Sequence, residues 1–273
     1  MGFILDMIKR SRNSRSYAKE REKAERKQEK LKASLPRLIA RTDSPGLLYR
    51  YYSQTRDSGL RFMIFNKLAR SAPSMAFGGI DWIILKEEEG RKLLLTKYLP
   101  LDRLPYARGL KSTRRYEGES WYVTYPDLHW YSSRLRAYLN EDFYDAFSEE
   151  EKSRILPVHI APDSEDAVCL SSAAEAGAFS SSEVNQVFIL SKTEVLEYSG
   201  KSFAARFCFD SEGQESAIWT RTPSMQDSIE HGIWKSTAFC FCAGDHPDQA
   251  PCFTTPAFDE LHAVRPAIWI SCP

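Results

Sequence analysis

The sequence predicts an α+β fold, because helical patterns occupy the middle of the chain and strand-like segments lie on both sides of them. Residues 80–85 and 92–98, joined by a polar turn at 87–90, predict an antiparallel hairpin. Three more strand-like segments follow later, separated by irregular loops: residues 217–223, 238–242 and 264–270. This order lacks the regular alternation of strand and helix that is typical of a parallel α/β sheet.

The predicted helices lie between these groups of strands. Apolar residues at four-residue spacing follow Ser133 and predict one helix: Leu135, Leu139 and Phe143. The pattern Ser-x-x-Glu occurs at 148–151 and again at 191–194 and predicts two helix starts. In such a capping box the serine side chain accepts the backbone amide of the glutamate, and the glutamate side chain accepts the backbone amide of the serine. The remaining middle segments are expected as short strands at 158–160 and 187–190 and as loops at 100–130 and 163–183.

The formal net charge of zero conceals an uneven distribution. The chain has 37 Lys and Arg against 37 Asp and Glu. Residues 1–40 hold 12 of the basic and five of the acidic residues, hence +7, so the other 233 residues carry −7. Residues 8–33 contain neither Gly nor Pro and predict a basic helical arm that ends at Pro36. Such an arm is either a solvated helix or a contact for an acidic partner, a nucleic acid or an anionic membrane.

Three segments are therefore expected along the chain. Residues 1–35 form the basic helical arm, and residues 36–75 form a helical lead-in that packs on the body. The apolar pattern of the lead-in predicts two short helices, split near Asp57. Residues 76–273 form the α+β domain with antiparallel strands and short helices.

The sequence predicts a cytoplasmic protein, because neither a transmembrane stretch nor a secretory signal pattern is found in it. No stretch approaches the ~18 consecutive apolar residues of a transmembrane helix. The apolar start at residues 2–5 precedes Lys9 and Arg10, the reverse of the order in a secretory signal. The six cysteines are accordingly expected as reduced thiols: Cys169, Cys208, Cys240, Cys242, Cys252 and Cys272.

Few residues suggest a cofactor, and none is predicted. Hydrolase signatures such as G-x-S-x-G and H-E-x-x-H do not occur. Thiolates and imidazoles are ligands that zinc prefers, so one group of residues is a candidate zinc site: Cys240, Cys242, His246 and Cys252. The alternating Cys240 and Cys242 also suit a half-buried strand with small core thiols.

A series of short motifs runs through residues 76–271. A Trp hairpin precedes an LLL-[ST]-K strand, and a W-x-x-S-x-L-R stretch continues through L-N-x-x-F to A-F-S-x-x-E. A V-F-I-L-S strand, W-T-R-T-P and V-R-P-A-I-W-I follow. In this order the motifs resemble a bacterial domain of unknown function that is common in gut Firmicutes. The matching residues include Trp82, Leu93–Lys97, Trp130, Arg136, Asn140, Phe147, Ser148, Glu151, Val187–Ser191, Trp219, Arg221, Pro223 and Val264–Ile270.

The W-x-R and V-R-P motifs are also similar to those of the C-type-lectin-like superfamily, which includes formylglycine-generating-enzyme-like domains. The resemblance implies that fold, with the first and last strands side by side. Some bacterial and phage members of the superfamily are targets of diversity-generating retroelements, with variable residues in the C-terminal part. This likeness makes a variable protein of that type one interpretation of the chain.

Two interpretations apply to the motif residues. Trp219, Arg221, Arg265 and Trp269 either line a ligand site or hold the core together, since buried Trp packs well and Arg can satisfy several carbonyls at once. We favour the structural role for one group: Trp82, Trp130, Arg136, Asn140, Trp219, Arg221, Arg265, Pro266 and Trp269.

The C-terminal loops, about residues 220–262, are the expected recognition surface. Loops on a rigid scaffold commonly carry binding, and this region is rich in aromatic and polar residues. The candidate ligand-binding residues are Trp219, Arg221, His231, Trp234, Asp245, His246, Asp248 and Phe258. The expectation is a non-catalytic recognition or scaffold protein. The alternative is a formylglycine-generating-enzyme-like or metal-dependent enzyme.

Overall fold

The structure is a computed structural model, and it describes most of the chain from residue 33 onwards. The described residues are 21–23, 25–26, 29–30, 33–101, 103–106, 113–117, 120–124, 129–161, 167–170, 177–180, 183–210, 212–228, 233–242, 252–254 and 260–272. They form a mixed α+β protein with antiparallel sheets and several short helices, as the sequence predicted. Within this described part, no helix is both long and apolar enough to cross a membrane.

The chain divides into two compact units, residues 1–64 and 65–273. The described part of the first unit is helical: residues 33–41, α2 (Pro45–Gln54) and the first residues of α3 (Ser58–Ala69). The split between α2 and α3 at residues 55–57 confirms the two helices predicted there. The Nε of Arg61 donates to the carbonyl of Thr55 at 2.8 Å and its guanidinium covers the Tyr52 ring, so the arginine holds the α2–α3 connection.

The prediction that Pro36 ends a helix is wrong. Residues 33–41 are helical on both sides of this proline. Leu35 and Ile39, one turn apart, are fully buried. Burial of two such side chains stabilises the segment by roughly 1.5–3 kcal/mol each, which offsets the cost of about 3 kcal/mol for a proline inside a helix.

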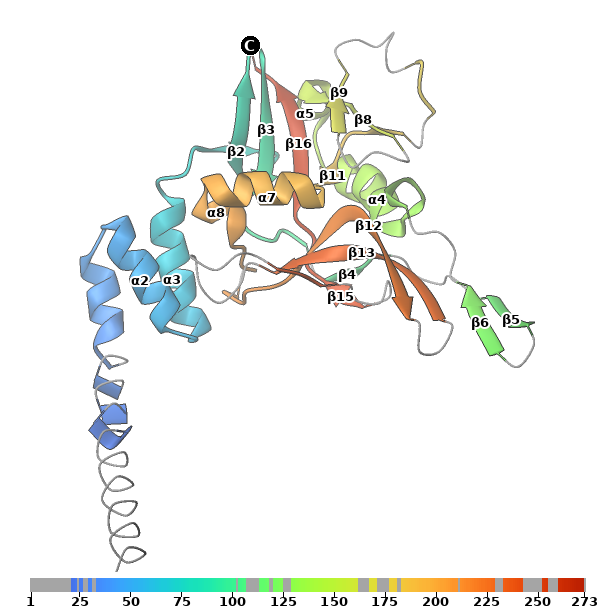
Figure 1. Ribbon diagram of the computed structural model, residues 1–273. Helices are drawn as coiled ribbons and strands as arrows, with labels where there is room; N and C mark the ends of the chain where they lie inside the picture. The colour runs from blue at the N-terminus through green and yellow to red at the C-terminus, as the bar shows by residue number, and fades with distance from the viewer. Residues whose placement is uncertain are drawn as a thin grey trace, which may run out of the picture. The chain divides into compact units, whose positions relative to one another are not determined.

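The main sheet of the second unit has six antiparallel strands, in the order β1-β2-β3-β16-β11, with β7 also paired to β16 (Figure 1). Its strands are β1 (Ser74–Phe77), β2 (Ile80–Glu88), β3 (Arg91–Thr96), β16 (Pro266–Ser271), β11 (Phe188–Ile189) and β7 (Ile155–Leu156). The β2–β3 hairpin confirms the first predicted hairpin. The last strand lies beside β3, where Ile268 faces Leu94, and not beside the first strand of the chain.

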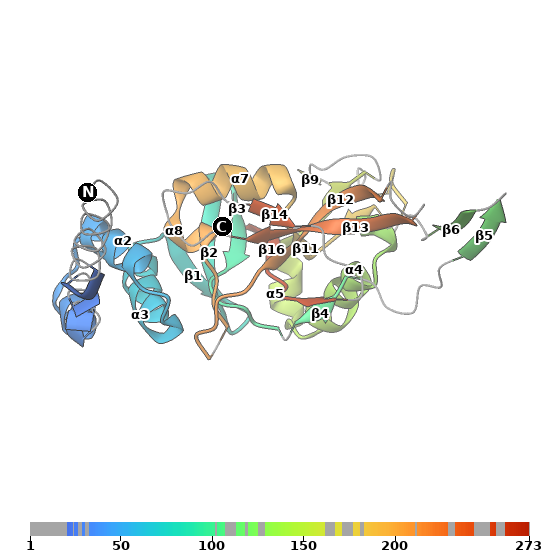
Figure 2. The ribbon, with the colours of Figure 1, turned by 60° about the horizontal axis from the view of Figure 1, so that its bottom comes forward.

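Short helices accompany this sheet. The helix α7 (Lys192–Lys201) is followed by α8 (Phe203–Arg206), which lies next to β2 (Figures 1 and 2). The capping boxes predicted at Ser148 and Ser191 are both present, at the starts of α5 (Glu149–Arg154) and α7. Each box satisfies amide donors at its helix start, so these helices begin where the local sequence dictates.

The helix predicted after Ser133 is present but changes its type. The side chain of Ser133 caps α4 (Arg134–Tyr138), which follows a 3₁₀ turn, η1 (Trp130–Ser132). The chain then continues as a π-helix, η2 (Leu139–Phe143). The four-residue spacing of the apolar side chains predicted an α-helix throughout. It did not indicate the π-helix, in which each turn contains an extra residue.

The other described sheets are smaller. The long hairpin of β12 (Ile218–Ser228) and β13 (Ile233–Cys242) pairs further with β6 and β14. The remaining strands are β4 (Leu104–Pro105), β5 (Thr113–Glu117), β6 (Ser120–Thr124), β8 (Val158–Ile160), β9 (Ala167–Cys169), β10 (Val184–Asn185), β14 (Cys252–Thr254) and β15 (Leu261–His262).

Two predicted loops thus contain strands. Residues 100–130 hold β4 and the β5–β6 hairpin, and residues 163–183 hold β9. The β5–β6 hairpin could have been predicted from the local sequence. The run of β-prone residues at 121–124 follows a glycine, Gly118, which suits a hairpin turn.

Candidate functional site

Trp219 lies at the start of β12 and is buried, with 1% of its surface exposed. Its indole Nε1 donates to the carbonyl of Leu104 at 2.8 Å. The ring packs against Tyr106, with centroids 5.4 Å apart, and meets the edge of His262 at 4.9 Å. Burial also raises the pKa of Tyr106, so its phenol stays neutral. These contacts tie β12 to the short β4–β15 sheet.

Arg221, two residues further along β12, is 2% exposed. Its Nη1 donates to the carbonyl of Ile189 at 2.7 Å and lies 2.6 Å from the Oε2 of Glu194. The backbone amide of Arg221 donates to Leu190, and the hydroxyl of Thr222 accepts the amide of Lys192 at 2.8 Å. The W-x-R-T-P motif therefore joins β12 to the end of β11 and to the start of α7.

Arg265 precedes β16 and is 1% exposed. Three donors of its guanidinium each reach a backbone carbonyl: Nε to Thr96 at 2.9 Å, Nη1 to Ala205 at 2.7 Å and Nη2 to Ala204 at 2.6 Å. The last two carbonyls belong to the short helix α8, and carbonyls at a helix end carry partial negative charge. Burial lowers the pKa of Arg265. The arginine connects the end of β3 to α8.

Asn185 and Asn140 organise the region around the π-helix. The Oδ1 of Asn185 accepts from Trp130 Nε1 at 3.1 Å and from Arg136 Nε at 2.7 Å. The Oδ1 of Asn140 accepts the amide of Val187 at 3.1 Å, while its Nδ2 donates to the carbonyl of the same residue at 2.9 Å. Burial lowers the pKa of Arg136. This network joins α4 and η2 to the segment that leads into β11.

The other motif residues lie in the main sheet. The Nε1 of Trp82 donates to the carbonyl of Phe77 at 2.8 Å across the β1–β2 turn. Pro266 begins β16 opposite Ile189, and Trp269 faces Leu93 with the guanidinium of Arg91 over its ring at 5.1 Å.

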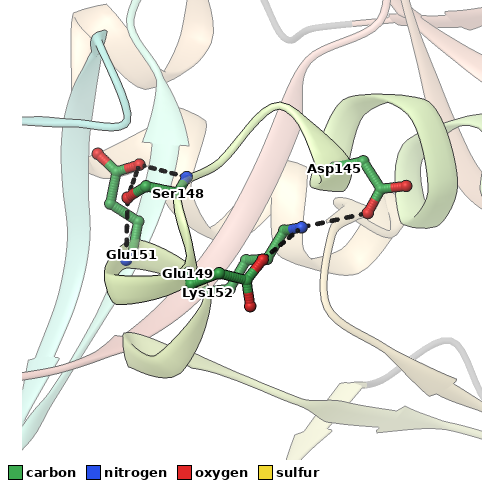
Figure 3. Close-up of polar contacts among 5 residues, drawn as sticks. All are labelled: Asp145, Ser148, Glu149, Glu151 and Lys152. Carbon is green, nitrogen blue, oxygen red and sulfur yellow. Dashed lines mark hydrogen bonds and ion pairs between the residues drawn. The ribbon is translucent and has the colours of Figure 1, made fainter.

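The start of α5 is a polar cluster on the surface (Figure 3). The Oε2 of Glu151 accepts from the amide of Ser148 at 2.9 Å and from its hydroxyl at 2.8 Å. The hydrogen bonds from Ser148, together with one from the amide of Gly78, hold the pKa of Glu151 below its usual range. Lys152 lies between Asp145 and Glu149, at 3.3 and 3.2 Å. Exposed pairs of this kind contribute about 0–1 kcal/mol, so the main role of the cluster is to cap the start of α5.

The recognition residues predicted from sequence are only partly described. Trp234 lies in β13, where its backbone pairs with Asp227 of β12. Five others lie outside the described residues: His231, Asp245, His246, Asp248 and Phe258. Trp219 and Arg221 lie at the buried base of the β12–β13 hairpin. The structure therefore separates these two residues from the part of the hairpin that contains Trp234.

The structure describes three of the four predicted metal ligands. Cys240 is buried in β13, Cys252 is exposed in β14, and Cys242 pairs through its backbone with Cys252. His246 lies outside the described residues. Among the residues that are described, no three His, Cys, Asp or Glu side chains are grouped so that they could hold a metal ion.

A surface cavity of about 290 Å³ was not anticipated from the sequence. It lies between the residues that follow β3 and those that precede β12: Leu99, Pro100, Leu101, Arg103, Asp210, Glu212 and Ser216. The Nη2 of Arg103 donates to the hydroxyl of Ser216 at 2.9 Å, and the Oδ1 of Asp210 accepts the amides of Glu212 and Gln214. These contacts mainly fix the loop that precedes β12. The two sides of the cavity are more than a hundred residues apart in the sequence, so no local sequence pattern indicated the cavity.

Comparison with known proteins identifies one family. A family model described as a domain of unknown function (DUF6273) matches residues 89–272, which is more than half of the chain. The matched segment begins in the turn after β2 and ends just after β16, so it includes the W-x-R-T-P and V-R-P motifs. Searches of curated proteins and of solved structures found no match.

Proposed function

Because the chain belongs to the DUF6273 family of domains of unknown function, we propose its function from its own residues: it is a non-catalytic recognition or scaffold protein. The binding surface in this proposal is the C-terminal region of about residues 220–262. The body that presents it has a C-type-lectin-like fold. Partners are proteins or small ligands that bind to the β12–β13 hairpin and to the segments that follow it.

The burial of the motif residues is the observation that carries this proposal. Trp219, Arg221 and Arg265 have exposed fractions of 1, 2 and 1%. Their donors already bind backbone carbonyls and the carboxylate of Glu194. A ligand could reach these groups only if the core opened. Binding is therefore assigned to the residues of this region that follow Arg221 along the β12–β13 hairpin and beyond it.

The β12–β13 hairpin suits the presentation of variable side chains. Its paired register runs from Pro223 opposite Ala238 to Ser228 opposite Ile233. The base is fixed by the contacts of Arg221, and loops that a rigid scaffold positions commonly carry binding residues. Trp234 lies on this paired part, and aromatic side chains supply contact area at a low entropic cost.

The C-type-lectin-like assignment rests on the order of the motifs and on the position of β16. In the main sheet the last strand lies next to β3, not next to β1, the first strand of this sheet. The pairing of β16 with an early strand of the domain supports the analogy, although that strand is not the first one. A protein varied by a diversity-generating retroelement is part of the same proposal, and in that case sequence variation among relatives would be confined to about residues 220–262.

A binding selection with the full chain tests the proposal. The chain is used to select ligands from a random-peptide library and from a glycan array, and each ligand is then measured against Trp234→Ala and against a control. Leu196→Ala is a matched control, because Leu196 is 45% exposed on α7 and lies outside the proposed binding region of about residues 220–262. We expect weaker binding for Trp234→Ala, unchanged binding for Leu196→Ala and unchanged far-UV circular dichroism for both. Equal binding by both variants would contradict the assigned surface.

The enzymatic alternative is tested with the same preparation. A formylglycine-generating-enzyme-like protein would consume oxygen in the presence of copper, a thiol and a cysteine-containing peptide. A metal-dependent enzyme would retain a stoichiometric metal ion after purification. Oxygen uptake that depends on the chain would overturn the non-catalytic proposal, and one zinc per chain that is lost in Cys240→Ser would establish a metal site.

The basic segment is assigned a tethering role in a cytoplasmic protein. Residues 1–64, the first compact unit, contain 16 Lys and Arg and seven Asp and Glu. An excess of positive charge attracts an acidic protein, a nucleic acid or an anionic membrane surface. Binding of the full chain to an acidic polypeptide, to double-stranded DNA or to phosphatidylserine vesicles should weaken as salt is raised. Binding that is insensitive to salt would remove the case for an electrostatic tether.

A further inference from the structure

We infer that Cys242 and Cys252 are a modification site, a cysteine pair that forms a reversible disulfide between β13 and β14. The two strands are antiparallel, and the backbone of Cys242 lies directly opposite that of Cys252. Among the strand pairs of the described residues, no other pair places two cysteines opposite each other.

The register that creates this pair has independent support from side chains. One position before Cys242, Phe241 lies opposite Phe253. The two rings pack against each other with centroids 5.6 Å apart. A shift of the strands by one residue would break this ring contact as well as the backbone pairing. The ring contact therefore helps to hold Cys242 and Cys252 opposite each other.

The backbone spacing matches that of a disulfide. Residues directly opposite in an antiparallel pair have Cα atoms about 4.5 or 5.5 Å apart, depending on the hydrogen-bonding position. A disulfide spans Cα atoms about 4.4–6.8 Å apart. Either position in the ladder therefore places the two Cα atoms within the range that a disulfide spans.

Solvent access makes Cys252 the first thiol to react. Cys252 is exposed, whereas Cys208 and Cys240 are buried. The oxidant is a low-molecular-weight disulfide. The thiolate of Cys252 attacks one of its sulfur atoms and expels a thiol, and the thiolate of Cys242 then attacks the Cys252 sulfur and expels the second thiol. The two protein thiols lose two electrons, the small disulfide gains them, and both protons end on the released thiols.

The bond would covalently join β13 to β14 within the proposed recognition region of about residues 220–262. A restraint on these two strands would change the affinity of that region for its ligand. This effect on binding rests on the proposed function, whereas the thiol chemistry does not.

Peptide mapping tests the chemistry directly. The reduced full chain is equilibrated with mixtures of reduced and oxidised glutathione, quenched with acid, alkylated with iodoacetamide and digested without reductant. We expect a peptide that links Cys242 to Cys252, loss of alkylation at both cysteines, and recovery of both with dithiothreitol. Oxidised wild-type chain that carries glutathione on Cys252 without the linked peptide, or that links Cys252 to another cysteine, would overturn the inference.

Variants separate this result from general thiol reactivity. In Cys242→Ser, Cys252 should instead retain a mixed disulfide with glutathione, because the second thiol is missing. Cys272→Ser, at a partly exposed cysteine just after β16, is the matched control and should leave the linked peptide unchanged. The ligand selected in the binding screen is then measured against reduced and oxidised wild type. A linked peptide with unchanged affinity would overturn only the effect on recognition, and absence of the linked peptide would overturn the site itself.

Discussion

The Nη1 of Arg221 lies 2.6 Å from the Oε2 of Glu194, and this ion pair joins β12 to the first turn of α7. The side chain of Arg221 is 1% exposed and that of Glu194 is 16% exposed. The same carboxylate oxygen accepts the amide of Ser191 at 2.9 Å and so completes the capping box of α7. One glutamate therefore starts a helix and neutralises a buried arginine on a strand.

Glu194→Gln should destabilise the fold strongly. The amide can still complete a capping box but leaves Arg221 buried without its counter-charge. Breaking a buried ion pair typically costs ~3–5 kcal/mol, and we expect the lower end because Glu194 keeps some contact with water. Urea unfolding of the wild type and of each variant measures the change in the free energy of unfolding. Glu197→Gln, in an exposed pair with Lys201 on the same helix, should change stability by no more than about 0.5 kcal/mol. Equal losses in the two variants would contradict the role of the pair.

Arg265 should tolerate no replacement. Arg265→Met leaves three buried carbonyls without donors, and each unsatisfied group costs about 1–3 kcal/mol. Arg265→Lys keeps the charge but cannot reach all three carbonyls at once. Both variants should unfold or lose several kcal/mol in urea titrations. Arg103→Met, at an exposed arginine, is the control and should stay folded. A folded Arg265→Ala that lost only ligand binding would assign Arg265 to the binding surface instead.

Gly78 and Gly79 form a matched pair for a steric test. Both have positive φ, +60° and +70°, and a side chain in that conformation costs about 1–2 kcal/mol. At Gly78 an added Cβ would also lie 2.2 Å from the Cε1 of Phe147, whereas at Gly79 it would meet no atom within 4 Å. Gly78→Ala should therefore lose about 1–3 kcal/mol more than Gly79→Ala in urea unfolding. Similar losses would mean that the Phe147 ring moves without cost.

Cys208 should make the fold less stable in alkali. Burial raises the pKa of its thiol to about 12 from an ordinary value near 9, with Glu215 and Asp210 acting in the same direction and Arg265 opposing them. Above about pH 9 the unfolded chain releases this proton while the folded chain keeps it, so stability falls by up to ~1.4 kcal/mol per pH unit until the folded pKa is reached. Cys208→Ala should flatten this decline in urea titrations between about pH 8 and 11. Cys252→Ala, at an exposed cysteine, serves as the control, and an unchanged slope in Cys208→Ala would refute the assignment.

Local patterns predicted the parts of the fold that local chemistry controls. The two capping boxes, the β2–β3 hairpin and the split between α2 and α3 each depend on a few neighbouring residues. The β5–β6 hairpin has a comparable local signal that was interpreted as loop. Pro36 shows the reverse case, because buried Leu35 and Ile39 outweigh the local preference of a proline.

Contacts between distant residues were not predictable from the sequence. The carbonyls that bind Arg265 belong to Thr96, Ala204 and Ala205, and no spacing rule relates them to residue 265. The pairing of Cys242 with Cys252 depends on the β13–β14 register in the same way. The composition of residues 225–262 indicated a recognition surface but not which side chains share it, and that assignment stays a prediction.

A substitution scan of residues 219–265 in the full chain, read out for both folding and binding, tests the central claim most directly. Folding is measured by protease resistance and binding by capture of the peptide or glycan selected with the wild-type chain. The account predicts that substitutions at Trp219, Arg221 and Arg265 abolish folding, while many at Met225 to Asp227 and at Trp234 change binding and leave folding intact. The contrary result is a scan in which binding is lost only together with folding, or in which folded Arg221 variants fail to bind.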